Sequence, residues 1–155
     1  MKKLIVMIMI LICAVSLNAQ GLVSKTYDAI DNKTTWFTET DNCSIMKITE
    51  AGQTRYYLSI YAYSNYCTVN NKGVKILFSD GTKWVKLTEE IDTDASDNNK
   101  GNFRYSGFVR LNATDLKLFS TKVIIAYKVY IFDVTLSEHE ALLFQSATQI
   151  IQTSK

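Results

Sequence analysis

The 155-residue sequence contains no proline, six glycines and a single histidine, His139. Because proline-rich, repetitive or low-complexity segments are absent, nothing indicates a linker or a second domain. One histidine leaves few ways to build a metal site, and no G-x-S-x-G, H-E-x-x-H or phosphate-binding glycine loop occurs. His139 itself is expected in the first turn of a helix, where a surface position is more common than a catalytic one. We therefore expect no catalytic residue, no cofactor and no metal.

Long apolar runs are also scarce. The longest covers residues 4–15, and a bilayer crossing needs about 20 residues. Lys2 and Lys3 precede this run, and small or polar residues follow it up to Ala19, which is the pattern of a secretory signal peptide over residues 1–19. A lipoprotein signal at Cys13 is less favoured, because the bulky Ile12 precedes it. The expected product is an exported protein, periplasmic or secreted to the cell surface, with one domain over residues 20–155 and no integral membrane segment.

Charge of one sign is lacking as well. The chain has 17 basic and 15 acidic residues, and Lys2 and Lys3 would leave with the signal peptide, so the mature chain is formally neutral. No lysine–arginine cluster occurs in residues 20–155. A nucleic-acid partner is therefore not expected.

Only two cysteines, Cys43 and Cys67, remain after the signal peptide. In an exported protein such a pair predicts a disulfide. The bridge would close a loop of 25 residues and stabilise the fold by roughly 3 kcal/mol in the chain-entropy model. Metal binding by the two thiols is a poorer interpretation, because two further ligands are missing.

What the sequence does contain is a series of short β-branched and aromatic runs separated by Asn, Asp and Gly, which predicts a β-rich fold. Strands are expected near residues 34–39, 43–49, 54–63, 73–79, 82–88, 102–111 and 121–135. Asp80 and Gly81 favour a two-residue hairpin turn. The last strand is apolar on both faces and should be central. Seven strands with short connections predict an antiparallel β-sandwich-like domain.

A helix is expected at the C-terminal end. Ser137 followed by Glu140 forms a capping-box pattern. The residues that then share one helical face are Ala141, Phe144, Thr148 and Ile151. These features predict a helix over residues 138–152 that packs on the sheet. A shorter helical segment is expected over residues 112–119, with Asn112 as its cap.

Tyrosine is abundant in one stretch, "RYYLSIYAYSNYC", residues 55–67. On a strand, Tyr56, Leu58, Ile60 and Ala62 would face the core, whereas Tyr57, Tyr61 and Tyr63 would share the opposite face. Rings two residues apart lie roughly 7 Å apart along a strand. Such a row can stack on sugars or on an extended peptide. The favoured alternative is that the C-terminal helix or a strand covers the rings, which would make them scaffold.

Two further stretches bear on function. Residues 89–102, "EEIDTDASDNNKGN", resemble the start of a calcium loop, but Asp97 stands where the loop needs glycine and Phe103 where it needs glutamate. A solvated polar loop is the better interpretation. Trp36 and Trp84 are candidates to assist a tyrosine site. Acidic residues that meet only in the fold leave a small hydrolase as a third hypothesis.

Three segments carry a resemblance: "NKTTWF" at 32–37, "GVKILFSDGTKW" at 73–84 and "YKVYIFD" at 127–133. With them the chain resembles a group of small secreted bacterial proteins of unknown function. The resemblance implies an exported β-rich domain and transfers no site residue. The expected function is a non-catalytic binding or envelope-associated accessory module for an unknown ligand or protein partner. The alternative is a carbohydrate- or peptide-binding module that uses Tyr57, Tyr61 and Tyr63.

Overall fold

The computed structural model describes residues 22–38, 40, 42–96 and 100–154. The predicted signal peptide over residues 1–19 lies outside these ranges. The described strands are β1 (Val23–Asp28), β2 (Lys33–Thr38), β3 (Cys43–Glu50), β4 (Gln53–Ser64), β5 (Lys72–Phe78), β6 (Lys83–Ala95), β7 (Phe103–Leu111), β8 (Ile124–Val129) and β9 (Phe132–Thr135). The helices are α2 (Ala113–Thr121) and α3 (Glu138–Thr153).

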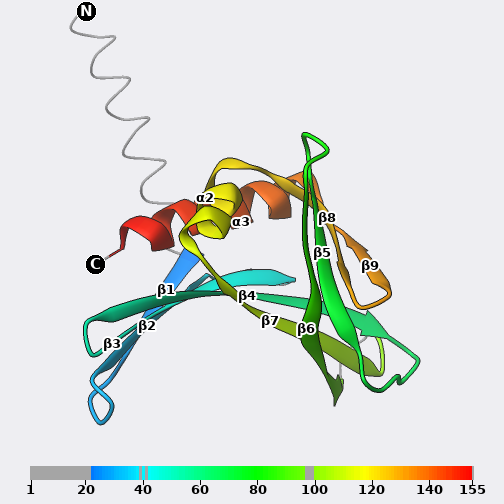
Figure 1. Ribbon diagram of the computed structural model, residues 1–155, viewed down its shortest axis with the longest axis horizontal. Coiled ribbons are helices and arrows are strands. Elements are labelled where there is room, and N and C mark those ends of the chain that lie inside the picture. The colour runs from blue at the N-terminus through cyan, green and yellow to red at the C-terminus, as the bar shows by residue number, and fades with distance from the viewer. Residues whose placement is uncertain (1–21, 39, 41, 97–99, 155) are drawn as a thin grey trace, which may run out of the picture.

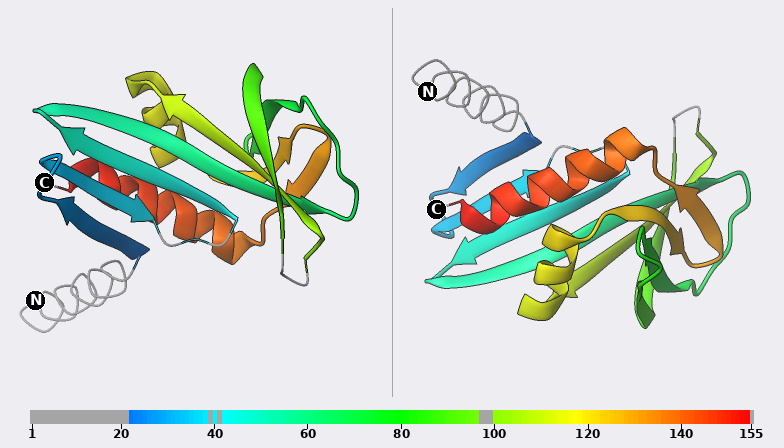
Figure 2. Two further views of the ribbon diagram at one scale, coloured as in Figure 1. Left: turned by 90° about the horizontal axis from the view of Figure 1, so that it is seen from below. Right: turned by 90° about the horizontal axis from the view of Figure 1, so that it is seen from above.

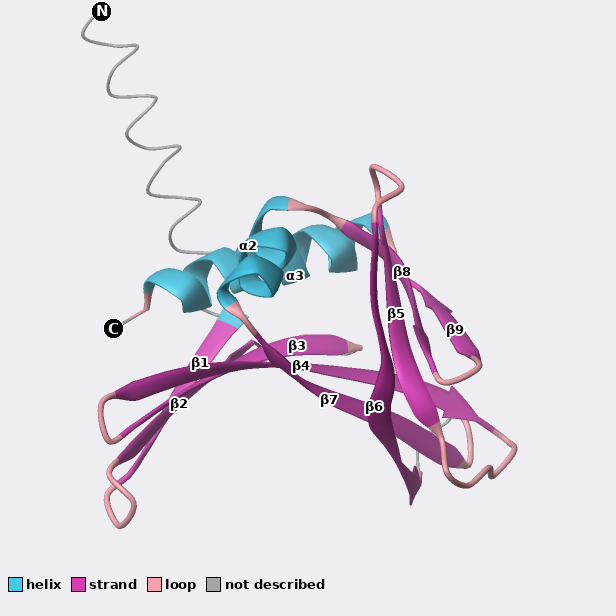
Figure 3. Ribbon diagram, viewed as in Figure 1, coloured by secondary structure: helices cyan, strands magenta, loops and turns pink. Residues whose placement is uncertain are grey.

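All nine described strands belong to one antiparallel sheet in the order β1-β2-β3-β4-β7-β6-β5-β8-β9 (Figure 3). The predicted β-rich fold and the C-terminal helix are thus confirmed. The arrangement differs from the predicted seven-stranded sandwich, because a single open sheet contains all the strands.

Strand β6 joins the two halves of this sheet. Its beginning pairs with β5 and its end with β7. Between these parts the β5–β6 register shifts at Lys72 and Val74, and the intervening Gly73 has a φ of +100°. Such a bulge increases local twist and bends a strand. Figure 1 shows the result: β5, β6, β8 and β9 stand steeply against the layer of β1–β4 and β7, with both helices in the angle between them.

The bend brings distant strands together around one core. Gly107 of β7 lies at this approach, where a Cβ would stand 3.0 Å from Cγ2 of Val74 in β5, closer than carbon atoms ordinarily pack. The ring of Tyr105 in β7 packs 4.4 Å from that of Phe132 in β9. One sheet that folds back on itself therefore encloses the core that we expected between two separate sheets.

Helix α3 covers one face of β1, β2 and β3, and no described helix lies on the other face of these strands (Figure 2). Its apolar stripe is buried as predicted, with Phe144 and Ile151 fully enclosed. Both helix ends are fastened to the β3 region. The Asn42 amide donates to Glu140 Oε1 over 2.8 Å, and Lys47 donates to the Ser154 carbonyl at the C-terminal cap. A lysine at that end also complements the helix dipole.

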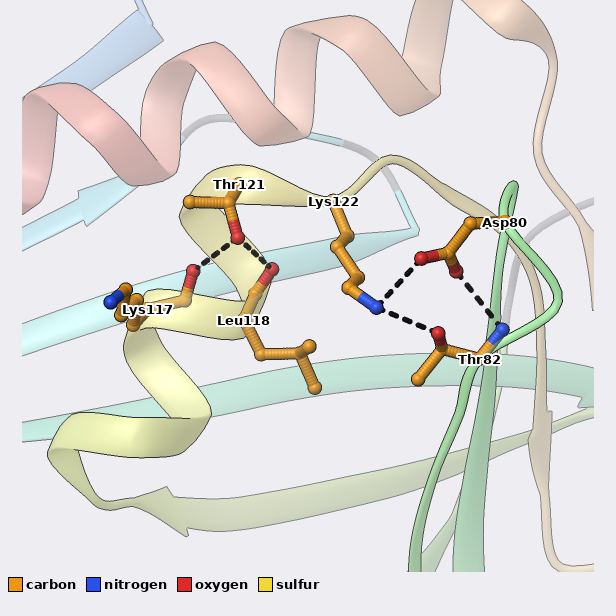
Figure 4. Close-up of polar contacts among 6 residues, drawn as sticks. All are labelled: Asp80, Thr82, Lys117, Leu118, Thr121 and Lys122. Carbon is orange, nitrogen blue, oxygen red and sulfur yellow. Dashed lines mark hydrogen bonds and ion pairs between the residues drawn. The ribbon is translucent and has the colours of Figure 1, made fainter.

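The second helix, α2, begins as predicted at the Asn112 cap, whose side chain accepts the N–H of Asp115. The predicted hairpin around Asp80 and Gly81 joins β5 to β6, but the expected two-residue turn is wrong: residues 79–82 connect the strands, and of the two residues only Gly81 has a positive φ, +81°. Lys122, at the end of α2, binds this hairpin: its Nζ lies 2.7 Å from Asp80 Oδ2 and 2.6 Å from Thr82 Oγ1 (Figure 4).

Three strand predictions need correction. The expected long central strand over residues 121–135 is a hairpin, β8 and β9, that turns at Tyr130 with a φ of +57°. The expected polar loop over residues 89–102 is strand as far as Ala95, because β7 pairs with it. Strand β1 was not predicted. It pairs with β2 along its whole length, so β2 supplies the sheet edge on which β1 forms.

Candidate binding face

The candidate site lies on strands β4 and β7, on the side turned away from α3. Its β4 residues are Tyr57, Ser59, Tyr61 and Tyr63, and its β7 residues are Arg104, Ser106, Phe108 and Arg110. We call these eight residues the tyrosine face. Helix α3 lies on the other side of the sheet, as the view from below in Figure 2 shows.

Alternation along β4 places the tyrosines there. Leu58, Ile60 and Ala62 point into the core and are at most 1% exposed. Tyr57, Tyr61 and Tyr63 point outward and are half-buried. The predicted division of this strand into a core face and a tyrosine face is therefore confirmed. The favoured alternative was that the C-terminal helix or a strand covers the tyrosine rings, but this helix, α3, lies on the opposite side of the sheet.

Strand β7 supplies the other half of the face. Directly opposed pairs are Tyr57 with Arg110, Ser59 with Phe108, Tyr61 with Ser106, and Tyr63 with Arg104. Sequence reasoning missed these β7 residues as site candidates. The alternation of "NFRYSGFVRL" did indicate one wet face, but nothing in the sequence showed that β7 pairs with β4.

The rings contact their neighbours instead of forming an open row. Tyr57 stacks on Phe108, with centroids 4.8 Å apart and planes 10° apart. The guanidinium carbon of Arg104 lies 5.4 Å from the Tyr61 ring centroid, and Lys100 Nζ lies 5.7 Å from that of Tyr63. These contacts explain why the tyrosines are half-buried on an uncovered face. A ligand would meet one side or the edge of each ring, together with hydroxyl and guanidinium groups.

Polar groups surround the rings. Arg104 pairs with Asp94 of β6 over 3.2 Å, and Asp92 lies opposite Ser106. The Ser106 hydroxyl oxygen is buried without a hydrogen-bond partner among the described residues, a state that costs free energy until a partner is supplied. Beside Phe108, a depression of about 510 Å³ is lined by Thr88, Glu89, Glu90 and Asp92.

The two tryptophans do not belong to this face. Trp36 and Trp84 are 6% and 7% exposed and lie on the core side of the sheet. Trp84 Nε1 donates to Asp115 Oδ1 over 2.7 Å, and Lys47 Nζ lies 4.7 Å from the Trp36 ring centroid. The suggestion that Trp36 or Trp84 assists the tyrosines is therefore wrong.

The cysteines are separate in the structure. Cys43 and Cys67 are both free thiols, so the structure does not contain the predicted disulfide. Cys43 points into the core from β3, whereas Cys67 is exposed in the loop after β4. Burial, aided by the nearby Glu140 carboxylate, raises the pKa of the Cys43 thiol. This thiol is a poor nucleophile, because the reactive form is the thiolate.

The described residues do not form a metal site. His139 is exposed in the first turn of α3. Within residues 22–38, 40, 42–96 and 100–154, no three His, Cys, Asp or Glu side chains are placed to hold a metal ion. None of the helices in that part of the chain is long and apolar enough to cross a membrane.

Comparisons with protein-family models, with curated proteins and with solved structures found no match. The function must therefore be argued from the tyrosine face itself.

Proposed function

We propose that this protein is an exported, non-catalytic accessory module that binds an extended carbohydrate across the tyrosine face. The observation that carries the proposal is the position of the face: aromatic rings, arginines and hydroxyls lie together on the side of β4 and β7 that is turned away from α3. Aromatic rings pack against the apolar face of a sugar, and the polar groups around them hydrogen-bond its hydroxyls. Export rests on the N-terminal sequence pattern.

The sheet topology favours carbohydrate over peptide. An extended peptide usually binds a sheet through main-chain hydrogen bonds at an exposed edge. Strands β4 and β7 are interior, and each is paired on both sides, β4 with β3 and β7, and β7 with β4 and β6. Their backbone groups are thus engaged, and a ligand of this face must bind through side chains. That requirement suits a sugar chain.

The test is a glycan-binding screen with the purified protein, followed by titration of a bound glycan to Phe108→Ala and Tyr61→Ala. Phe108 is 46% exposed, so its removal should leave the fold intact. We expect roughly tenfold weaker binding, about 1.4 kcal/mol. Tyr27→Ala is the matched control, because Tyr27 is an exposed aromatic residue on edge strand β1 and should bind like the wild type.

Three results would contradict the proposal: a screen without any bound glycan, Phe108→Ala and Tyr61→Ala variants that bind unchanged, or a Tyr27→Ala variant weakened equally. Hydrolysis of a bound glycan would overturn the non-catalytic part. For export, protein recovered from outside the cytoplasm should begin at Gln20, and recovery of the uncleaved chain there would contradict the predicted signal peptide.

A further inference from the structure

A second surface, distant from the tyrosine face in the strand order, lies on the outer side of β5, β6 and β8. In β5 the core-facing residues are Val74, Ile76 and Phe78, so Lys75 and Leu77 point outward. The pairing register then defines two rows across the strands. One row contains Val85, Lys75, Lys128 and Asp133, and the other contains Lys83, Leu77, Ala126 and Thr135.

An apolar floor runs obliquely through these rows. It consists of Val85 from β6, Leu77 from β5 and Ala126 from β8, and it lines a groove of about 270 Å³. Val85 suits a strand because it is β-branched. Its apolar side chain is nevertheless open to solvent, since the residue is 44% exposed. Lys75, Lys83, Lys128 and Asp133 surround this floor.

The charges around the floor are unbalanced. Lys75 lies directly opposite Lys128 on the antiparallel strand, and like charges in that position are unfavourable. Asp133 neutralises Lys128 over 3.0 Å. Lys75 and Lys83 form no ion pair with any carboxylate of the described residues. The groove therefore has three ammonium groups and one carboxylate at an apolar surface.

We propose that this groove binds a small amphiphilic carboxylate, with its apolar body on Leu77, Val85 and Ala126 and its anionic head between Lys75 and Lys83. A simple anion would satisfy the lysines but leave the floor exposed. A neutral apolar molecule would cover the floor but supply no anion to Lys75 and Lys83. A short-chain carboxylate suits a groove of about 270 Å³, which lies below the ~300 Å³ at the lower end of drug-sized pockets.

The test is a titration of the full chain with hexanoate, followed by amide shifts in the ¹H–¹⁵N NMR spectrum. Saturable shifts are expected at Lys75, Leu77, Val85 and Ala126. Lys75→Gln should weaken hexanoate binding at least fivefold, and Val85→Ser should weaken it similarly by interrupting the floor. Lys72→Gln is the matched control, because Lys72 is an exposed lysine of the same strand that pairs with Glu90 outside the groove.

Each alternative occupant gives a different result that would overturn the proposal. Equal affinity for hexanamide would show that charge is irrelevant. Equal affinity for acetate or phosphate would show a plain anion site without a role for the floor. Shifts that depend on protein concentration without hexanoate would assign the groove to a second copy of the chain. Absence of saturable shifts would leave no site, and none of these outcomes bears on the tyrosine face.

Discussion

At the scale of single residues, the Asp115 carboxylate joins groups from two different elements. It accepts the Trp84 indole N–H over 2.7 Å, lies 3.6 Å from Lys86 Nζ and completes the capping box of α2 with Asn112. The residue is only 8% exposed. It therefore connects β6 to the helix that follows β7.

We expect Asp115→Ala to lower the free energy of unfolding by about 2 kcal/mol, because the buried Trp84 N–H loses its acceptor. Asp115→Asn keeps an oxygen at that position and should cost clearly less. Urea unfolding followed by tryptophan fluorescence measures both. If the alanine variant is as stable as the asparagine variant, the Trp84 hydrogen bond does not have the role that the geometry assigns to it.

At the scale of elements, helix α3 packs one apolar stripe against the sheet and exposes its opposite side to solvent. Phe144 is fully buried and meets Phe119 of α2 at 6.3 Å between centroids, whereas Leu142 on the same helix is 46% exposed. Phe144→Ala should cost about 3–5 kcal/mol through lost burial and a cavity. Leu142→Ala should cost under about 1 kcal/mol. Equal losses in thermal or urea unfolding would show that α3 is not docked through this stripe.

The elements that sequence reasoning predicted well have local causes. The α3 capping box, the hairpin at Asp80–Gly81 and the alternation of β4 depend on residues a few positions apart, and each is confirmed, although the hairpin connection is longer than the predicted two-residue turn. The β8–β9 turn was missed because Tyr130 is not a residue that favours a positive φ. Its backbone N–H bonds to the Gly73 carbonyl, so tertiary pairing holds the turn.

The candidate site divides in the same way. The outward position of Tyr57, Tyr61 and Tyr63 follows from alternation within one strand, and the sequence was sufficient for it. Their contacts with Phe108 and Arg104 depend on the pairing of β4 with β7, which are separated by two other strands in the chain. Pairing over such a distance is decided by the whole fold, and local sequence patterns do not contain it.

At the scale of the whole molecule, the bent sheet has to be held in its folded-back form. Three kinds of contact do so. Tyr127 of β8 donates its hydroxyl to the carbonyls of Asn42 and Tyr61, at 2.8 and 2.7 Å. Gly107 admits Val74 against β7, and Lys122 binds the β5–β6 hairpin. Of these contacts, only the one made by Lys122 contains a carboxylate that acid can protonate.

The Asp80–Lys122 contact gives the folded-back arrangement a dependence on acid (Figure 4). The hydrogen bond from Lys122, with a smaller contribution from the Thr82 N–H, lowers the pKa of Asp80 to about 2. In an unfolded chain the pKa of aspartate is about 3.9, so the stabilisation is complete above that pH and is lost as the pH falls through about 2.

The melting-temperature difference between wild type and Asp80→Asn should therefore close between pH ~4 and ~2. In Lys122→Met, NMR titration should show the Asp80 pKa rising toward its ordinary value. A melting-temperature difference that does not change with pH, or an unchanged Asp80 pKa in Lys122→Met, would show that this contact does not couple the hairpin to the rest of the sheet.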